Sequence, residues 1–283
     1  MRLRAPAKVN LRLRVLGRRD DGYHLIETVI VPVSLYDEVE ITRLKDGRAK
    51  KAELTVTCDH PGVPSGRMNL AYQAASLLLR AKKISACIHI HIRKGIPVGA
   101  GLGGGSSDAA ATLKGLSRVL GLSFRRGEML SLAASLGADV PFFIRGHSAV
   151  ARGIGELLTP IRSLPRLWMV LLYPGFPVST RWVYENLKLT KDIENTSINF
   201  SLRDPEKIRR ALVNDLENVT LRRYPAIASL KERLLQEGAT GALMSGSGSS
   251  AFGVFPGLQS ARKAFNRLRR EEGFETFLVR SLK

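Results

Sequence analysis

The stretch Pro97-Val-Gly-Ala-Gly-Leu-Gly-Gly-Gly-Ser-Ser-Asp108 decides how the rest of this chain is interpreted. Five glycines lie between residues 99 and 105, and helix-forming residues follow from Ala109 onward. Glycine lets the backbone approach a ligand closely, and the first turn of a helix offers unpaired N–H groups and the positive end of its dipole. A flexible linker would not be bounded so tightly by a strand and a helix. The stretch therefore predicts a phosphate-binding loop.

The neighbouring sequence excludes two common kinds of phosphate loop. The pattern G-x-x-x-x-G-K-[ST] is absent, so this is not a Walker A loop. Gly99, Gly101 and Gly104 satisfy G-x-G-x-x-G, but dinucleotide-binding folds place that pattern after a buried parallel strand. Residues 84–92 instead alternate between apolar and polar side chains, which predicts a half-buried strand of an antiparallel or mixed sheet.

Composition limits the class of protein. The 283 residues suffice for one large or two modest domains, and no apolar run could span a bilayer. The two cysteines, Cys58 and Cys87, have no motif spacing, and no secretory segment precedes the first strand, which favours the cytoplasm. The net charge of +19 is compatible with a nucleic-acid surface, with attraction of polyanionic substrates, or with a solvated arginine-rich surface. We favour the solvated surface, with some steering of substrates, because no aromatic residues interleave with the basic ones.

The pattern of the chain predicts an α+β fold, because strands and helices alternate unevenly. Residues 3–15 alternate with a period of two, which predicts a strand with one buried face and with Lys8 and Asn10 on the other face. Breaker residues at 153–165 predict a boundary between domains 1–155 and 156–283. The further predicted strands are 26–33, 38–44, 52–58, 84–92, 167–172, 242–244, 251–255 and 274–279. The predicted helices are 69–83, one that begins at about 108 after the glycines and ends near 120, 126–136, 180–187, 205–216, 225–236 and 258–271.

Three segments resemble the GHMP kinases, the small-molecule kinases related to galactokinase, homoserine kinase and mevalonate kinase. They are the glycine-rich stretch, Ala5-Pro-Ala-Lys-Val-Asn-Leu11 and Met244-Ser-Gly-Ser-Gly-Ser-Ser250. The resemblance implies a two-lobed α+β fold with mixed and antiparallel sheets and an active site in the cleft between the lobes. It implies an ATP-binding N-terminal domain and a substrate-side C-terminal domain, whose last strand could return to the N-terminal lobe. It also implies ATP as cosubstrate and Mg²⁺ to shield the phosphates.

Three further segments are similar to those family members that act on a cytidine-diphosphate-linked methylerythritol in isoprenoid precursor synthesis without mevalonate. They are Gly22-Tyr-His24, Leu136-Gly-Ala-Asp-Val-Pro141 and Asn214-Asp-Leu-Glu217. The implied reaction phosphorylates the C2 hydroxyl of a small molecule with a cytidine diphosphate group. We expect a cytoplasmic monomer or weak homodimer that binds neither nucleic acid nor membrane.

Two other functions stay open at this point. The first is another GHMP kinase, such as homoserine or mevalonate kinase, and the segment Gly22–His24 is the feature that distinguishes it. The second is a basic nucleic-acid-binding protein, which a steep salt dependence of DNA binding without ATP turnover would reveal.

The predicted ATP site consists mainly of the glycine-rich stretch. Ser106 and Ser107 either cap the following helix or contact phosphate, and the two roles are compatible. Asn69 is a predicted helix cap that could also reach the nucleotide. Asp108 is assigned only a favourable interaction with the helix dipole and is left out of the site. The predicted ATP-binding residues are Asn69, Pro97, Val98, Gly99, Ala100, Gly101, Leu102, Gly103, Gly104, Gly105, Ser106 and Ser107.

Asp139 and Lys8 are the predicted catalytic residues. Asp139 stands among small and apolar residues, close before Pro141. From the sequence alone it either forms a turn or accepts a proton, and Lys8 is either one of several solvated basic residues or functional. The resemblance assigns Asp139 as general base and pairs it with Lys8. A nearby cation would keep the carboxylate ionised and stabilise the developing alkoxide.

The predicted substrate-binding residues are Asn10, Tyr23, His24, Tyr184, Gly246 and Ser247. The resemblance places Tyr23 and His24 at the cytosine ring by stacking and hydrogen bonds, although they could form an ordinary surface loop. Tyr184 is either an opposite aromatic wall or a core residue. Residues 245–249 are either a tight hairpin or, by resemblance, a loop that packs against the nucleotide loop and the substrate phosphates. No metal ligands are predicted, because His89 and His91 have no partner close in the sequence.

Overall fold

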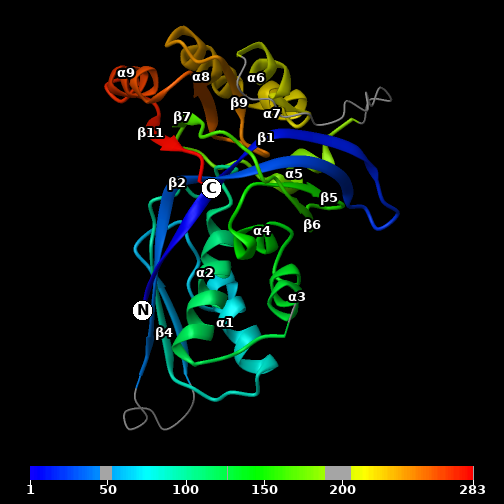
Figure 1. Cartoon of the computed structure of the whole chain (residues 1–283), viewed down its shortest axis with the longest axis vertical. Coiled ribbons are helices and arrows are strands. Elements are labelled where there is room, and N and C mark those ends of the chain that lie inside the picture. Colours follow the sequence, from blue (N-terminus) through cyan, green and yellow to red (C-terminus); the bar gives the residue numbers. More distant parts are fainter. Residues whose placement is uncertain (45–52, 126, 189–204, 283) are drawn as a thin grey trace. The chain divides into compact units, whose positions relative to one another are not determined.

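The computed structural model describes residues 1–44, 53–125, 127–188 and 205–282 (Figure 1). The chain divides into two compact units. The first consists of Met1–Ala7, Leu35–Val98 and Gly103–Gly146, and the second of Lys8–Ser34, Gly99–Leu102 and His147–Lys283. This division differs from the expected boundary after residue 155, because two long strands and the tip of the glycine-rich loop are shared between the units. The functional division into an ATP-binding and a substrate-side domain stays a prediction.

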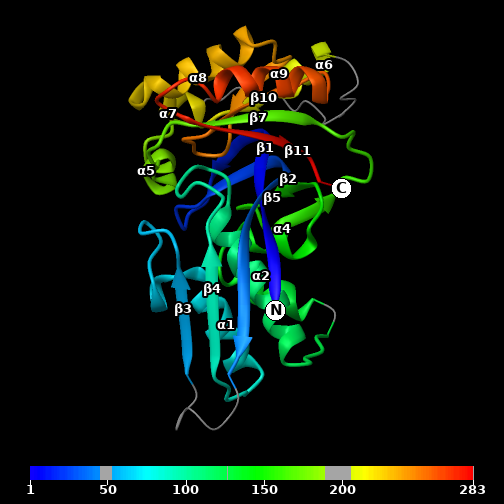
Figure 2. The same ribbon diagram turned by 90° about the vertical axis from the view of Figure 1, so that its left-hand side faces the viewer.

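The first unit is a sheet with helices on one face. Strand β2 (His24–Arg43) pairs antiparallel with β4 (Ile88–Arg93), which pairs parallel with β3 (Leu54–Cys58). The strand before the glycine-rich loop therefore lies in a mixed sheet, as its alternation predicts. Its three isoleucines are buried, and helices α1 (Leu70–Ala81) and α2 (Gly104–Val119) cover one face of these strands (Figures 1 and 2).

Local signals explain where the helices of the first unit begin. Asn69 caps α1 as predicted, because its Oδ1 accepts a hydrogen bond from the N–H of Ala71 at 2.8 Å. The short helices are η1 (Gly66–Met68), α3 (Glu128–Ala134) and α4 (Val140–Arg145). Helix α4 was not predicted, since six residues are too few to show a helical period.

The second unit contains an antiparallel sheet with the order β11-β7-β10-β9. The strands are β7 (Trp168–Tyr173), β9 (Gly241–Met244), β10 (Ala251–Phe255) and β11 (Glu275–Arg280). Helices α8 (Pro225–Gln236) and α9 (Leu258–Leu268) lie on one face of this sheet, and their buried side chains share a core with β7 and β10 (Figure 2). The last strand belongs to this sheet, and Ser281 forms a single bridge to Val33 of β2.

Strands from distant parts of the sequence complete the second unit. The parallel pairing of β1 (Arg2–Arg18) with β8 (Val213–Asn214) joins Arg12 to Val213. Strand β5 (Ala149–Arg152) pairs with β2, and β6 (Leu157–Pro160) pairs with β5. The remaining helices are α5 (Thr180–Glu185), α6 (Pro205–Ala211) and α7 (Glu217–Arg223).

The structure confirms the α+β class with mixed and antiparallel sheets, and it corrects several elements. The predicted strands 26–33 and 38–44 are one strand, residues 84–87 precede β4 rather than belong to it, and the helix at 205 ends at Ala211. Strands β5, β6 and β8 and helix α7 were missed, because elements of two to seven residues carry little periodicity and depend on tertiary pairing. The predicted element starts at residues 52 and 126 lie outside the described residues.

Strand β1 also differs from its prediction. Its apolar face is buried as expected, but Lys8, Asn10 and Arg12 on the opposite face are only 6%, 3% and 9% exposed. The interpretation of Lys8 as one of several solvated basic residues is therefore wrong. None of the helices in the described ranges combines the length and apolar character needed to cross a membrane.

Candidate active site

The tip of the glycine-rich loop, Gly99–Leu102, docks on the turn between β9 and β10 in the second unit. The Oγ of Ser245 donates to the carbonyl of Gly101 at 3.1 Å, and the N–H of Ser250 donates to the carbonyl of Ala100 at 3.1 Å. Gly101 has a φ of +75°, and a Cβ there would lie 2.1 Å from the carbonyl oxygen of Ser245. Only glycine allows this close approach. The two small-residue loops therefore form one interlocked surface.

Lys8 is fixed next to this surface by its main chain and its side chain. Its N–H donates to the carbonyl of Leu102 at 2.9 Å, and its Nζ donates to the Oδ1 of Asn10 at 2.6 Å. The amide nitrogen of Asn10 donates to the Oγ1 of Thr28 at 2.8 Å, which in turn donates to the carbonyl of Arg12 at 2.7 Å. This buried chain of hydrogen bonds sets the orientation of the Asn10 amide and, through it, of the ammonium group.

The turn that follows β9 brings the predicted substrate residue Gly246 to Lys8 and Asn10. A Cβ on Gly246 would lie 3.2 Å from the Nζ of Lys8 and 3.3 Å from the Oδ1 of Asn10. The Nδ2 of Asn214 donates to the carbonyls of Met244 at 2.9 Å and of Gly246 at 2.7 Å, which fixes the start of the turn. The hydroxyl groups of Ser247 and of Thr180 on α5 are 2.8 Å apart.

In the first unit, the loop passes into the first turn of α2. Gly103 is the N-cap of α2, so Ser106 and Ser107 lie inside the helix and do not cap it. Ser107 is 1% exposed, and its Oγ has no hydrogen-bond partner among the described residues. A buried hydroxyl of this kind normally has a partner. Together with the unpaired N–H groups of the first turn, it fits an oxyanion ligand.

Asp139 stands at the N-cap of α4, which also belongs to the first unit. It is half-buried, and its side chain does not accept a capping hydrogen bond from the first turn of α4. The opposite end of α4 is held by the Nζ of Lys114 on α2, which donates to the carbonyl of Phe143 at 2.8 Å. Burial, followed by the charge of Arg118, lowers the pKa of Lys114. Helix α4 is thus fixed to the helix that follows the glycine-rich loop.

Two family models match the chain. The model described as the GHMP kinases N terminal domain matches residues 69–147, and that described as GHMP kinases C terminal matches residues 192–273. The 4-diphosphocytidyl-2-C-methyl-D-erythritol kinase of Geobacter metallireducens is 46% identical over 280 residues, which cover 99% of this chain and 98% of the relative. That of Geobacter sulfurreducens is 46% identical over 272 residues, 96% of each chain.

This chain belongs to the GHMP kinase family.

Solved structures agree with that assignment. A crystal structure of 4-(cytidine 5'-diphospho)-2C-methyl-D-erythritol kinase has a TM-score of 0.82 and 37% identity, and the match covers all of both chains. Homoserine kinase from Cytophaga hutchinsonii has a TM-score of 0.75 at 19% identity, covering 100% of this chain and 94% of that chain. Mevalonate kinase from Methanococcus jannaschii has a TM-score of 0.70 at 16% identity, covering 100% and 98%. The last two share the fold with this GHMP kinase.

The aromatic residues predicted for the substrate lie in the second unit of this GHMP kinase. The rings of His24 and Tyr184 are 5.1 Å apart between centroids and inclined by 33°. Burial and the charge of Arg18 lower the pKa of His24, which keeps its ring neutral at pH 7. Tyr23 is 60% exposed. The structure therefore brings His24 and Tyr184 into contact and leaves the ring of Tyr23 in solvent.

Several residues of this site escaped the sequence analysis. Asn214 was noted only as part of a family segment, and Thr28 carries no sequence signal. Asp108 was left out, yet it is buried and bonded to Lys94. Lys8 and Asp139 belong to different units, so their pairing stays a prediction.

The residues described by the structure offer no group of three or more His, Cys, Asp or Glu side chains for a metal ion. His89 and His91, considered as a metal pair, instead bond through Nδ1 to the hydroxyl groups of Thr55 and Thr57, both at 2.9 Å. These contacts support the structural interpretation of the two histidines.

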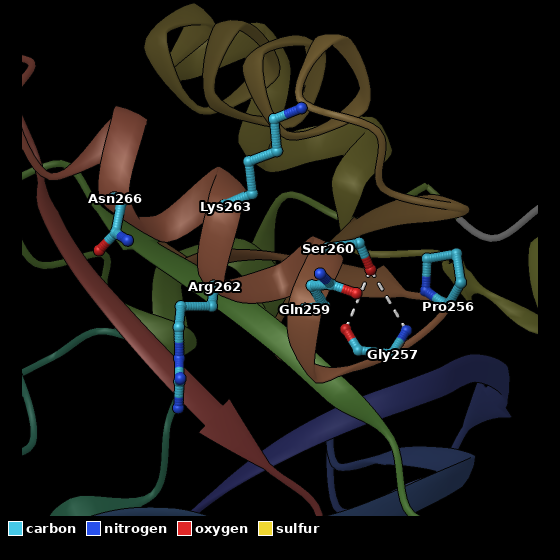
Figure 3. A pocket seen from close by; sticks show the side chains of 7 residues that line it. All are labelled: Pro256, Gly257, Gln259, Ser260, Arg262, Lys263 and Asn266. Atoms are coloured by element: carbon cyan, nitrogen blue, oxygen red, sulfur yellow. Dashed lines mark hydrogen bonds between the residues drawn. The ribbon is translucent and has the colours of Figure 1, made fainter.

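A surface pocket at the start of α9 contains none of the predicted site residues (Figure 3). The Oγ of Ser260, which lines it, donates to the carbonyl of Gly257 at 3.0 Å and accepts from the N–H of Gly257 at 3.3 Å. Its two cations, Arg262 and Lys263, extend in different directions from the helix (Figure 3). Since the cations do not converge, we assign no anion site there.

Proposed function

We propose that this GHMP kinase transfers a phosphoryl group from ATP to the C2 hydroxyl of 4-diphosphocytidyl-2-C-methyl-D-erythritol, in isoprenoid precursor synthesis without mevalonate. One observation carries the proposal. Relatives with that name align with 96% or more of the chain at 45–46% identity, whereas the homoserine and mevalonate kinase structures reach only 19% and 16%. The latter values support a common fold alone.

Phosphoryl transfer requires positioning of the two substrates, neutralisation of phosphate charge and an acceptor for the proton of the nucleophile. We assign the first task to residues 97–107, whose backbone N–H groups would bind the phosphates of ATP. The unpartnered hydroxyl of Ser107 supports this assignment, since a phosphate oxygen would satisfy it. The Oδ1 of Asn69 already caps α1 and its Nδ2 donates to the carbonyl of Pro64 at 2.9 Å, so a contact with the nucleotide would use the second N–H or the second lone pair of this amide.

Asp139 is the proposed general base and Lys8 the proposed electrostatic partner. Asp139 is half-buried at the start of α4 and does not cap that helix, and the family resemblance of residues 136–141 supports its role as the base. Lys8 is a buried cation held in one orientation, which is what stabilisation of a developing alkoxide requires. In this mechanism Asp139 accepts the proton of the C2 hydroxyl while Lys8 offsets the negative charge on the attacking oxygen.

Mg²⁺ fits this donor set as an ion held mainly by ATP. It prefers oxygen ligands and often keeps several waters beside substrate phosphates. The buried hydroxyl of Ser107 is the oxygen ligand that the first turn of α2 offers. When bound, Mg²⁺ shields the charge of the phosphates.

The acceptor site is proposed in the second unit. Asn10 and Gly246, which lie next to Lys8, would bind the phosphate-bearing part of the substrate together with Ser247 of the same turn. The contact between His24 and Tyr184 supports a place for the cytosine ring, with Tyr23 closing over it from solvent. A neutral imidazole offers one donor and one acceptor, which are compatible with the cytosine edge.

Release of ADP with a panel of alcohol acceptors tests this proposal. The panel contains the cytidyl substrate, homoserine, mevalonate and galactose at equal concentrations. We expect turnover with the cytidyl compound alone, and preferential turnover of any other acceptor would refute the assigned substrate. We further propose a cytoplasmic enzyme that is a monomer or weak homodimer and binds no nucleic acid, which sedimentation and a DNA-binding titration would check.

A further inference from the structure

Three buried ionic side chains lie at the base of the glycine-rich loop in the first unit. We call Asp37, Lys94 and Asp108 the loop-base cluster. The Nζ of Lys94 donates to the Oδ2 of Asp37 and to the Oδ2 of Asp108, the latter at 3.0 Å. The side chains of Lys94, Asp37 and Asp108 are 6%, 0% and 4% exposed. Lys94 directly precedes the loop and Asp108 follows it, so the cluster joins the two ends of the loop.

The cluster also fixes the backbone on both sides of the loop. The Oδ1 of Asp37 accepts hydrogen bonds from the N–H groups of Gly95 and Ile96, both at 2.8 Å. On the other side, a Cβ on Gly104 would lie 3.2 Å from the Nζ of Lys94 and 3.3 Å from the Oδ2 of Asp37. The start of α2 therefore lies so close to the cluster that any residue larger than glycine at position 104 would push against the side chains of Lys94 and Asp37.

We propose that Asp37, Lys94 and Asp108 are positioning residues that hold the two ends of the loop in the arrangement that binds ATP. The proposal rests on the proposed function only in that the loop binds ATP. A buried ion pair generally stabilises a protein no more than well-packed apolar residues would. Three buried charges at the two ends of a ligand loop are therefore better explained by the geometry they impose than by stability.

The charges of the cluster do not balance. One lysine faces two carboxylates, so the formal charge is −1 when both are ionised. Burial, together with Asp37 and against the effect of Lys94, raises the pKa of Asp108 to about 7. A hydrogen bond between the side chains of Asp108 and Asp37 also raises this pKa, because only a protonated carboxyl group can donate it.

The charged groups that change the pKa of Asp108 are the other two members of the loop-base cluster. The charges of Lys94 and Asp37 act directly on its pKa. Burial raises the pKa of the Cys58 thiol on β3, and the charges of Lys94 and Asp108 also affect it, in opposite directions. The helices packed against α2 turn apolar side chains inward. The buried residues of α1 are Ala71, Ala74, Ala75 and Leu78, that of α3 is Ala133, and those of α4 are Val140, Pro141, Phe142 and Phe143. The acidic residue of α3, Glu128, is paired with Lys82.

This arrangement links ATP binding to pH. Below pH 7 Asp108 is protonated, and the cluster is formally neutral. Above pH 7 it carries a net negative charge beside the first turn of α2, where it repels the phosphates. The dissociation constant of an ATP analogue should therefore increase between pH 6 and pH 8.

Calorimetric titration of the full chain with a non-hydrolysable ATP analogue tests the positioning role without any alcohol acceptor. Asp108→Ala removes the bond between Lys94 and α2, and we expect roughly tenfold weaker binding at pH 6, the loss typical of one charged hydrogen bond. The KM for the cytidyl substrate should change less than twofold. Lys82→Met is the matched control, because Lys82 pairs with Glu128 at 2.7 Å in the same unit, away from the loop. It should leave analogue binding unchanged.

Asp108→Asn separates charge from hydrogen bonding. Asparagine still accepts the bond from Lys94 but never ionises, so binding at pH 6 should match the wild type and the weakening between pH 6 and pH 8 should disappear. Wild-type affinity of a folded Asp108→Ala protein, or a wild-type pH slope in Asp108→Asn, would overturn the proposal. If Asp108→Ala does not fold, the slope of Asp108→Asn decides alone. Normal analogue binding without turnover of the cytidyl substrate would instead refute the proposed function.

Discussion

The Nζ of Lys8 lies 2.6 Å from the Oδ1 of Asn10, and both side chains are buried on one face of β1. The side-chain amide of Asn10 is held in this orientation, because its nitrogen donates a hydrogen bond to the hydroxyl of Thr28. The oxygen is thereby presented to the ammonium group, and the position of a predicted catalytic cation depends on a neutral side chain two residues away.

Asn10→Leu should therefore lower kcat, because leucine keeps the bulk but removes an acceptor that orients Lys8. We expect a decrease of about ten- to a hundredfold, the range for loss of a hydrogen bond to a charged group. The affinity for an ATP analogue should stay within twofold. ADP release at saturating substrates measures the effect, and a wild-type kcat would show that Lys8 needs no support from Asn10.

Asp139→Asn should reduce kcat by about 10²- to 10⁴-fold, because the amide keeps the shape of the carboxylate but cannot accept the proton. Lys8→Met should also lower kcat. The double variant should lose less than the sum of the two effects, since the two residues act as a unit. Steady-state kinetics of the three variants provide the test. Near-normal kcat in Asp139→Asn would assign this residue a structural role.

Gly101→Ala should weaken nucleotide binding by more than about tenfold, because its Cβ would lie 2.1 Å from the carbonyl oxygen of Ser245 and force the loop away from its dock. Gly121→Ala is the matched control. Gly121 has a similar φ of +63°, but no atom lies within 4 Å of its Cβ position. The control should cost about 1 kcal/mol of stability from backbone strain alone, with no change in affinity. Calorimetry and thermal melting separate the two effects, and equal affinities of the two variants would contradict the prediction.

Asn214→Ala should destabilise the second unit and lower kcat together. The substitution leaves the carbonyls of Met244 and Gly246 buried without the amide donor, at a cost of about 2 to 4 kcal/mol. Asn186→Ala is the matched control, because it removes an exposed asparagine whose amide donates to the carbonyl of Trp182 at 2.8 Å. It should change the free energy of unfolding by about 0.5 kcal/mol or less. Chemical denaturation measures both. Equal free energies of unfolding would show that the Asn214 bonds do not support the turn.

The KM for the cytidyl substrate should depend on the neutral form of His24. Since burial and Arg18 lower the pKa of His24 below its ordinary value of 6.5, KM should stay constant from pH 8 to pH 6.5 and rise only at lower pH. Arg18→Gln removes the repelling charge and raises the pKa, so the rise should begin at higher pH. His24→Ala should raise KM for the cytidyl substrate at every pH and leave KM for ATP unchanged. An unchanged profile in Arg18→Gln would separate His24 from the cytosine site.

Local signals made part of this fold predictable. The cap at Asn69, the helix after the glycines and the strand β1 each depend on residues that are neighbours in sequence. The burial of Lys8 was not predictable, because Thr28 and Gly246 come from distant segments. The loop-base cluster escaped for the same reason, since Lys94 is 57 residues from Asp37 and 14 from Asp108. A charged residue without an opposite charge nearby in sequence looks like a surface residue until the fold supplies its partner.

The pairing of β1 with β8 has a consequence for how the protein is made. The N–H of Val15 donates to the Oδ2 of Asp215, which lies 200 residues further along the chain. On the ribosome, this edge of β1 has to remain unpaired until residues 213–215, about 200 residues further along the chain, have been synthesised. Contacts between residues so far apart in sequence slow folding and leave strand edges exposed to aggregation. A premature stop before residue 213 would release a polypeptide that carries Lys8 but can never complete the strand arrangement around it.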